Sequence, residues 1–259
     1  ARQRVVVVST APDADVRDVT AALRANVPLP TDAFYQIAPN RWLRDGDLNP
    51  VEVSAVRAAV RSASLAVLHG DTTSMGPPSA LGTKALLLLV PPVTEAPELL
   101  VRAAPSSPLQ AALSGMVLES LPPLLAVSPA RGGVTALSAA PGMAATGATP
   151  IVSVMEGAVR RVLITASGYG RWRSRGGVSE VAFQALIGGA TDWLLGARGA
   201  ASVPAPVTPL QRAGLPVRWR RGGAPTSIVA LARDGDRATR RDTLIFADGG
   251  EATMAPLAA

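Results

Sequence analysis

Few side chains in this chain can do chemistry. The 259 residues include one histidine, His69, and no cysteine, which excludes disulfides, thiolate metal sites and cysteine nucleophiles. His69 follows the apolar run at residues 65–68 and precedes Asp71, with hydroxyls at residues 72–74. An imidazole near a carboxylate and a hydroxyl suits the base of a Ser-His-Asp hydrolase, and an imidazole can also bind a metal. His69 and Asp71 are therefore candidates for a ligand pocket.

The alternative for His69 is a loop histidine that hydrogen-bonds to the backbone. A hydrolase needs its nucleophile on a constrained elbow such as G-x-S-x-G, and the sequence has no such motif. A metal site needs three or four ligands, and the only nearby carboxylate is Asp71. No phosphate loop or dinucleotide fingerprint is present either. We therefore predict no catalytic residue, no metal site and no cofactor.

Arginine and aromatic side chains gather in two segments. Planar guanidinium groups bind carboxylates and phosphates, and tryptophan stacks. These segments are candidate binding surfaces for a protein partner or an anionic lipid surface. No nucleic-acid-binding motif accompanies them, so nucleic acid is not the expected partner. The alternative is that the tryptophans pack internally while the arginines are solvated. The candidate residues are Tyr169, Arg171, Trp172, Arg173 and Arg175, and then Trp219, Arg220 and Arg221.

The elements that would position these residues alternate between strand and helix patterns. Continuous apolar runs predict buried strands of a parallel sheet, and apolar residues at helical spacing predict helices between them. This alternation is typical of an α/β protein. A glycine-rich loop is expected at residues 168–177, at the carboxyl end of the last strand. The predicted strands are 5–8, 33–37, 65–68, 85–90, 151–155 and 162–166, and the predicted helices begin near Asp13, Pro50 and Ser107 and span 179–195, with Ser179 as the cap.

Two stretches depart from this pattern. Residues 91–149 are rich in Pro, Ser, Ala and Gly, and we expect loops and edge strands packed over the sheet. After a Pro/Ala-rich linker at 198–209, short apolar runs separated by glycine turns predict a small antiparallel β-domain at 210–259. The charged run at 237–241 is expected to be a hairpin loop. The predicted α/β domain spans residues 1–197.

Composition limits the class of protein. Hydrophobic residues make up 48% and charged residues 17% of the chain, which excludes a disordered tail. The formal net charge of +6, almost all of it from arginine, favours acidic partners or reflects a GC-rich genome. No apolar run reaches the ~18–20 residues of a membrane-spanning helix. The start ARQRVVVV suggests a processed or excised segment, with any anchor outside the given residues.

Three segments together resemble one family. They are VVVVSTAPDADVRDVTAAL at 5–23, SPLQAALSGMVLESLPPL at 107–124, and residues 168–196 with their WRSRGG core. The chain resembles the class I glutamine amidotransferase-like domains of bacterial membrane-anchored proteins, which are associated with von Willebrand A-type proteins. The resemblance implies a flavodoxin-like, mostly parallel sheet with flanking helices, followed by a β-rich segment.

The resemblance also implies what this chain lacks. Class I amidotransferases use a cysteine on a strand-to-helix elbow, a later histidine and a glutamate. This chain has no cysteine, and Gly168-Tyr169-Gly170 stands where the family would place its histidine. We therefore expect a degenerate, non-catalytic accessory or scaffolding subunit of a membrane-associated complex, on the extracytoplasmic side. The alternative is a hydrolase or small-ligand-binding protein that uses His69 and residues 168–175.

Overall fold

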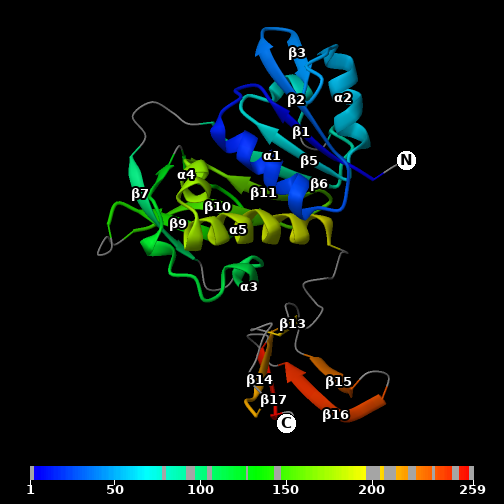
Figure 1. Cartoon of the computed structure of the whole chain (residues 1–259), viewed down its shortest axis with the longest axis vertical. Coiled ribbons are helices and arrows are strands. Elements are labelled where there is room, and N and C mark those ends of the chain that lie inside the picture. Colours follow the sequence, from blue (N-terminus) through cyan, green and yellow to red (C-terminus); the bar gives the residue numbers. More distant parts are fainter. Residues whose placement is uncertain are drawn as a thin grey trace. The chain divides into compact units, whose positions relative to one another are not determined.

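The structure is a computed structural model. It forms two compact units, Ala1–Gly196 and Ala197–Ala259. Figure 1 shows both units. The structure describes residues 3–77, 80–91, 97–103, 107–126, 128–142, 147–196, 205–206, 214–220, 226–234, 237–246 and 251–256. Except for 205–206, the predicted linker at 198–209 lies outside these ranges.

The first unit is built on a large mixed sheet with helices on both faces. Its parallel half has the spatial order β2-β1-β5-β6-β11. The apolar runs predicted as buried strands form this half, and every residue of β1 and β5 is buried. The α/β class is therefore confirmed. The bounds are β1 (Val5–Ser9), β2 (Thr31–Ala38), β5 (Leu65–His69), β6 (Ala85–Leu89) and β11 (Arg160–Ile164).

Antiparallel strands extend this sheet at both edges, which gives it twelve strands. Beyond β2 lie two short strands that the sequence did not predict. Beyond β11, β10 pairs antiparallel as the predicted hairpin, and four further strands follow. The strands predicted in the stretch 91–149 are present, but three of its segments extend the sheet itself instead of packing over it. The bounds are β3 (Arg41–Arg44), β4 (Pro50–Val51), β7 (Glu98–Ala103), β8 (Leu124–Ala126), β9 (Val134–Ala140), β10 (Thr149–Met155) and β12 (Ala166–Ser167).

The two faces of the sheet have separate cores. Because side chains alternate along a strand, Val5 and Val7 pack with α1, α4 and α5, whereas Val6 and Val8 pack with α2. Figure 1 shows α1 and α5 side by side across one face. The helices are α1 (Ala14–Asn26), α2 (Val53–Ser62), the short α3 (Gln110–Leu113), α4 (Tyr169–Arg175) and α5 (Gly177–Leu195), with 3-10 turns η1 (Thr73–Met75) and η3 (Leu118–Ser120).

Three helix starts differ from the prediction. The helix predicted to begin near Pro50 is α2, which begins at Val53, because Pro50 and Val51 pair as strand β4. Residues 169–175 form α4 instead of the expected loop. Tyr169 and Trp172 are spaced for one helical face and both enter the core, which stabilises this short helix. Ser179 does not cap α5, which begins two residues earlier after Gly176 and has no side-chain cap. The Asp13 prediction is confirmed, since its side chain caps α1 by accepting from the Val16 amide at 2.9 Å.

The second unit contains small antiparallel sheets. β14 pairs with β13 and β17, and β15 pairs with β16 in a long hairpin. Phe246 and Met254 belong to its buried cluster. The charged run at 237–241 was wrongly predicted as a loop, because it begins β16. The bounds are β13 (Ala205–Pro206), β14 (Val217–Arg220), β15 (Thr226–Asp234), β16 (Arg237–Phe246) and β17 (Glu251–Met254).

Candidate functional site

The site lies where β1 and β5 end side by side. Ser9 and His69 are the last residues of these strands and are register partners in the parallel ladder. From β1 the chain crosses to β2 on one side, and from β5 it crosses to β6 on the other. Such a reversal of direction at the carboxyl ends of parallel strands leaves a crevice in which open α/β sheets bind ligands.

His69 is held in a buried polar cluster with Ser9 and Asp13. The ring is 1% exposed, and its Nδ1 lies 2.9 Å from the Ser9 Oγ. Its Nε2 lies 3.4 Å from Asp13 Oδ2, in a geometry that makes no hydrogen bond, and neither atom has another partner among the described residues. The histidine therefore faces two side chains, not the backbone alone.

Asp71, the predicted pocket partner of His69, is placed elsewhere. It is exposed, and its carboxylate accepts from the Thr73 amide at 3.1 Å within its own loop. Hydrogen bonding to the Thr73 side chain, with a further contribution from the Thr73 amide, lowers the pKa of the Asp71 carboxyl. Ser9 and Asp13, the residues that meet His69, were not predicted as site residues. Their signal was available, because both follow the predicted strand at residues 5–8, whose neighbour in the parallel sheet carries the histidine.

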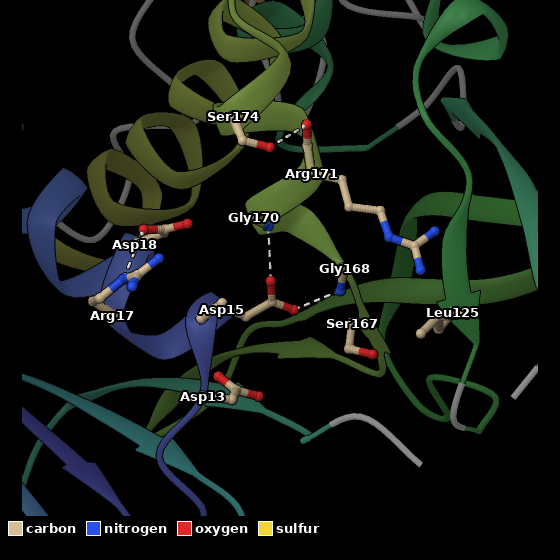
Figure 2. A pocket seen from close by; sticks show the side chains of 11 residues that line it. Asp13, Asp15, Arg17, Asp18, Leu125, Ser167, Gly168, Gly170, Arg171 and Ser174 are labelled. Carbon is tan, nitrogen blue, oxygen red and sulfur yellow. Dashed lines mark hydrogen bonds and ion pairs between the residues drawn. The ribbon is translucent and has the colours of Figure 1, made fainter. Parts of the chain in front are cut away.

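A pocket of about 410 Å³ opens beside this cluster. Figure 2 shows the carboxylates of Asp13 and Asp15 on the α1 side, and Ser167 and Gly168 on the opposite side. His69 and Tyr169 do not line it, although the ligand-binding interpretation of the sequence required both. The lining residues come from α1 and its cap (Asp13, Ala14, Asp15, Arg17, Asp18), from β8 (Leu125), and from β12 and α4 (Ser167, Gly168, Gly170, Arg171, Ser174).

Asp15 joins the two walls of the pocket. Its carboxylate accepts from the backbone amide of Gly168 at 2.5 Å and from that of Gly170 at 2.8 Å. We call this pair of contacts the Asp15 clasp. Gly168 has φ +98°, a conformation that favours glycine. A Cβ at Gly170 would lie 3.0 Å from Asp18 Oδ2 and 3.3 Å from Asp15 Oδ1, so a larger residue would press on the clasp.

The two carboxyls at the mouth of the site titrate differently. Burial raises the pKa of Asp15, and the neighbouring charge of Asp13 adds to this, although the Gly170 and Gly168 amides favour the ionised form. Burial acts the same way on Asp13, but the contact with His69 and the hydrogen bond from Val16 outweigh it and lower the pKa of that carboxyl. The site thus holds one readily ionised and one reluctantly ionised carboxyl.

The predicted binding segment at 169–175 is split between core and surface. Tyr169 and Trp172 are 3% and 0% exposed, so neither side chain is available to a partner. They meet edge to face at 5.3 Å, and Trp172 Nε1 donates to the Pro122 carbonyl at 2.7 Å. Burial raises the pKa of Tyr169 well above its ordinary value, and the charge of Asp15 adds to the shift.

The arginines of the same helix face outward. Arg171 pairs with Glu98 at 2.5 Å and Arg173 with Asp18 at 2.7 Å, while Arg175 is exposed. In the second unit Trp219 is partly buried against the small core, and Arg220 follows it on β14. Arg221 lies outside the described residues.

The geometry at the carboxyl ends of β1 and β5 limits which reactions this site can catalyse. Ser9 is fully buried, so its hydroxyl cannot reach a substrate without rearrangement. No group of three metal-ligating side chains occurs within the described ranges. Of the helices that the structure describes, none is both long and apolar enough to span a membrane. No protein-family model matches the chain, and no curated protein does either.

Proposed function

We propose that this chain is a non-catalytic accessory or scaffolding subunit of a membrane-associated complex, built on a degenerate amidotransferase-like fold. The observation that carries the proposal is that the only imidazole of the chain, His69, is buried. Both ring nitrogens of His69 face side chains of the same chain, the ring is 1% exposed, and the sequence has no cysteine. A glutaminase of this class needs an accessible thiolate and a base that relays its proton.

The strand order supports the fold within this proposal. Numbered in chain order, the five parallel strands lie in the order 2-1-3-4-5, which is the order of flavodoxin-like folds. The resemblance of segments 5–23, 107–124 and 168–196 to amidotransferase-like domains agrees with such a sheet. The extracytoplasmic membrane location rests on that resemblance alone.

The outward arginines of α4 supply the proposed contact surface. Arg171 and Arg175 are exposed on the helix whose apolar side is fixed in the core; Arg171 is paired with Glu98, so an acidic partner would share or displace that contact. A protein subunit with an acidic patch is the proposed partner, with an anionic lipid surface as an additional contact. Trp219 and Arg220 of β14 remain further candidates, and nucleic acid is not proposed.

The test is to isolate the tagged protein from its native membrane fraction. We expect a discrete complex that is lost when Arg171 and Arg175 are both replaced by glutamate, because charge reversal removes the attraction. The matched control is Arg41→Glu, since Arg41 is also exposed but lies on β3. Hydrolysis of glutamine or of an ester by the purified protein, if abolished in the His69→Ala variant, contradicts the proposal.

The pocket favours a second candidate function, the binding of a small molecule at the carboxyl edge of the sheet. Its volume of about 410 Å³ falls within the ~300–1,000 Å³ that is common for small-molecule sites. A hydrolase is the weaker form of this candidate, because the Ser9 hydroxyl is buried. Ligand binding without turnover fits the pocket better.

A further inference from the structure

Two basic residues, Lys84 and Arg161, lie next to each other at the amino ends of β6 and β11, at the sheet edge opposite the pocket. The two strands run parallel and side by side (Figure 1), and Arg161 is the register partner of Leu86, which follows Lys84 by two positions. The Arg160 amide donates to the Lys84 carbonyl at 2.9 Å. The ladder therefore holds the backbones of the two basic residues together.

Both side chains leave the sheet on the face that α2 covers. Arg160 sends its guanidinium to the other face, where it donates to carbonyls at the end of α5. Because side chains alternate along a strand, Arg161 points to the face of α2. Leu86 belongs to the core beneath α2, and Lys84, two positions before it, lies on the same face.

The last turn of α2 adds a third cation, Arg61. A Cβ placed on Gly82 would lie 3.4 Å from the carbonyl oxygen of Arg61 and 3.7 Å from its Cβ. The end of α2 therefore lies against the chain just before Lys84. Arg61 and Lys84 are exposed, and Arg161 is half-buried. We call Arg61, Lys84 and Arg161 the basic cluster.

No carboxylate neutralises the basic cluster within the part of the chain that the structure describes. None of its three side chains forms an ion pair there. The acid that precedes β11 in the chain, Glu156, is paired with Arg160 at 2.9 Å. Like charges gathered at one edge repel one another, so an anion bound among them would relieve that repulsion.

The guanidinium of Arg161 provides a second and independent observation. Its Nε is buried and has no hydrogen-bond partner among the described residues, whereas the Nε of Arg160 donates to Glu156 at 2.9 Å. The chain thus packs the stem of Arg161 without giving its guanidinium an acceptor, although such donors are normally satisfied. The two Nη atoms are not among its buried atoms, so they remain accessible to a ligand.

These features select an anion with several oxygens. A guanidinium binds oxyanions through two parallel hydrogen bonds, and a lysine ammonium is a common phosphate ligand. A phosphate group carries more negative charge and more acceptor oxygens than a carboxylate, so it can face cations from three segments at once. We infer that the basic cluster binds a phosphate group, carried either by a lipid headgroup or by a soluble phosphate.

This inference goes beyond both candidate functions and rests on neither. The basic cluster lies at the edge of the sheet opposite the pocket, and it shares no residue with the arginines of α4. If the phosphate belongs to a lipid, the chain has a membrane contact separate from the proposed partner surface on α4.

The experiment is a titration of the full chain with sodium phosphate at constant ionic strength, followed by the NMR signals of the Arg161 Nε–H group and the Lys84 amide. We expect saturable shifts. The phosphate concentration at half-saturation should rise about tenfold or more in Lys84→Gln, Arg161→Gln and Arg61→Gln, because each variant loses a contact between charged groups. Lys84 is exposed, so its substitution leaves the fold intact.

The matched control is Arg57→Gln. Arg57 is exposed on the same helix as Arg61, but its Nε already donates to the Ser74 carbonyl at 2.9 Å. This variant should bind phosphate like the unchanged protein. If Arg57→Gln weakens binding as much as Lys84→Gln does, the effect is one of overall charge and the site is overturned.

Further probes identify the source of the phosphate. Phosphatidylglycerol vesicles that sediment the unchanged protein, but not a Lys84→Gln/Arg161→Gln double variant, identify a lipid headgroup. Shifts with sodium phosphate and no sedimentation with vesicles identify a soluble phosphate. Both results support the inference.

Three results would overturn it. Sodium acetate shifting the signals at the same concentrations as phosphate points instead to the carboxylates of an acidic protein. Sodium chloride doing the same shows charge screening alone. If no salt shifts the signals and vesicles do not sediment the protein, the basic cluster is not an anion site. The proposed complex, which is tested through Arg171 and Arg175, is unaffected by any of these results.

Discussion

The Asp15 carboxylate accepts a hydrogen bond from the Gly170 amide at 2.8 Å, across 155 positions of sequence. Its other oxygen accepts from Gly168 at 2.5 Å. One side chain of α1 thereby satisfies backbone donors at the start of α4, which a helix otherwise leaves unpaired. The Asp15 clasp holds the two walls of the pocket together. We expect that a substitution which removes one of its two hydrogen bonds will disturb the site.

Replacing Asp15 by asparagine should open the clasp. An amide has only one oxygen, so its NH₂ group would face one of the two backbone donors and leave it unpaired. We expect Asp15→Asn to lower the free energy of unfolding by about 1–3 kcal/mol, measured by urea denaturation. The control is Asp192→Asn, because Asp192 is exposed on α5 and should change stability by less than about 0.5 kcal/mol. Equal stabilities of the two variants would contradict the structural role of the clasp.

Asp13 and Asp15 should change the free energy of unfolding with pH in opposite directions. The pKa of Asp13 is lowered in the folded protein, so its contribution is present above the unfolded pKa of about 3.9 and is lost as pH falls through the folded value. The pKa of Asp15 is raised, so its contribution is present below about pH 3.9 and is lost as pH rises through the folded value.

Urea titrations at several pH values test this prediction. The stability difference between the unchanged protein and Asp13→Asn should shrink as the solution is acidified, and asparagine keeps the cap so that only the charge is removed. The difference between the unchanged protein and Asp15→Asn should instead grow on acidification. Parallel curves for both variants would show that neither carboxyl is perturbed in the folded state.

The parallel half of the sheet was predictable because its signals are local. Residues 5–8 and 65–68 are continuous apolar runs, and Asp13 marks the start of a helix. The strands between residues 91 and 149 were not predictable in the same way. In β7 the alternating buried residues are Leu99 and Val101, and the partner β9 is distant in sequence. Antiparallel extension of the sheet depends on these long-range pairings.

The site was predicted only in part for a similar reason. The single histidine was an obvious candidate, but its partner Ser9 lies 60 positions away, and ladder register decides that they meet. In residues 168–177 the glycines at both ends suggested a loop. The apolar pair Tyr169 and Trp172, three residues apart, was the signal for a helix. That spacing buries both aromatic rings and leaves the arginines outside.

Gly168 should tolerate no side chain without cost. Its φ of +98° and ψ of 11° lie in the left-handed region, where an L-residue costs about 1–2 kcal/mol. We expect Gly168→Ala to be destabilised by that amount in urea denaturation. Gly142→Ala is the control, because a Cβ there meets nothing within 4 Å and its φ is not in the left-handed range. A Gly168→Ala protein as stable as the control would show that the turn before α4 can relax.

Arg160 should be the residue that holds the C-terminal end of α5. It is 5% exposed, and its Nη1 donates to the carbonyls of Trp193 at 2.9 Å and Gly196 at 2.7 Å. Its Nε donates to Glu156 at 2.9 Å, and the guanidinium lies 5.2 Å from the centre of the Trp193 ring. One charged side chain thus satisfies carbonyls that the end of a helix leaves open.

Two substitutions of Arg160 separate the contribution of its positive charge from that of its planar guanidinium group. Arg160→Met should lower the free energy of unfolding by about 1.5–3 kcal/mol, because hydrogen bonds from a charged group are lost. Arg160→Lys keeps the charge but not the planar fork, so its stability should fall between that of the methionine variant and that of the unchanged protein. Arg175→Met, at an exposed position of α4, is the control. Amide hydrogen exchange should also speed up in the last turn of α5 first. If Arg160→Met matches Arg175→Met in stability and exchange, then the end of α5 is held by its apolar packing alone.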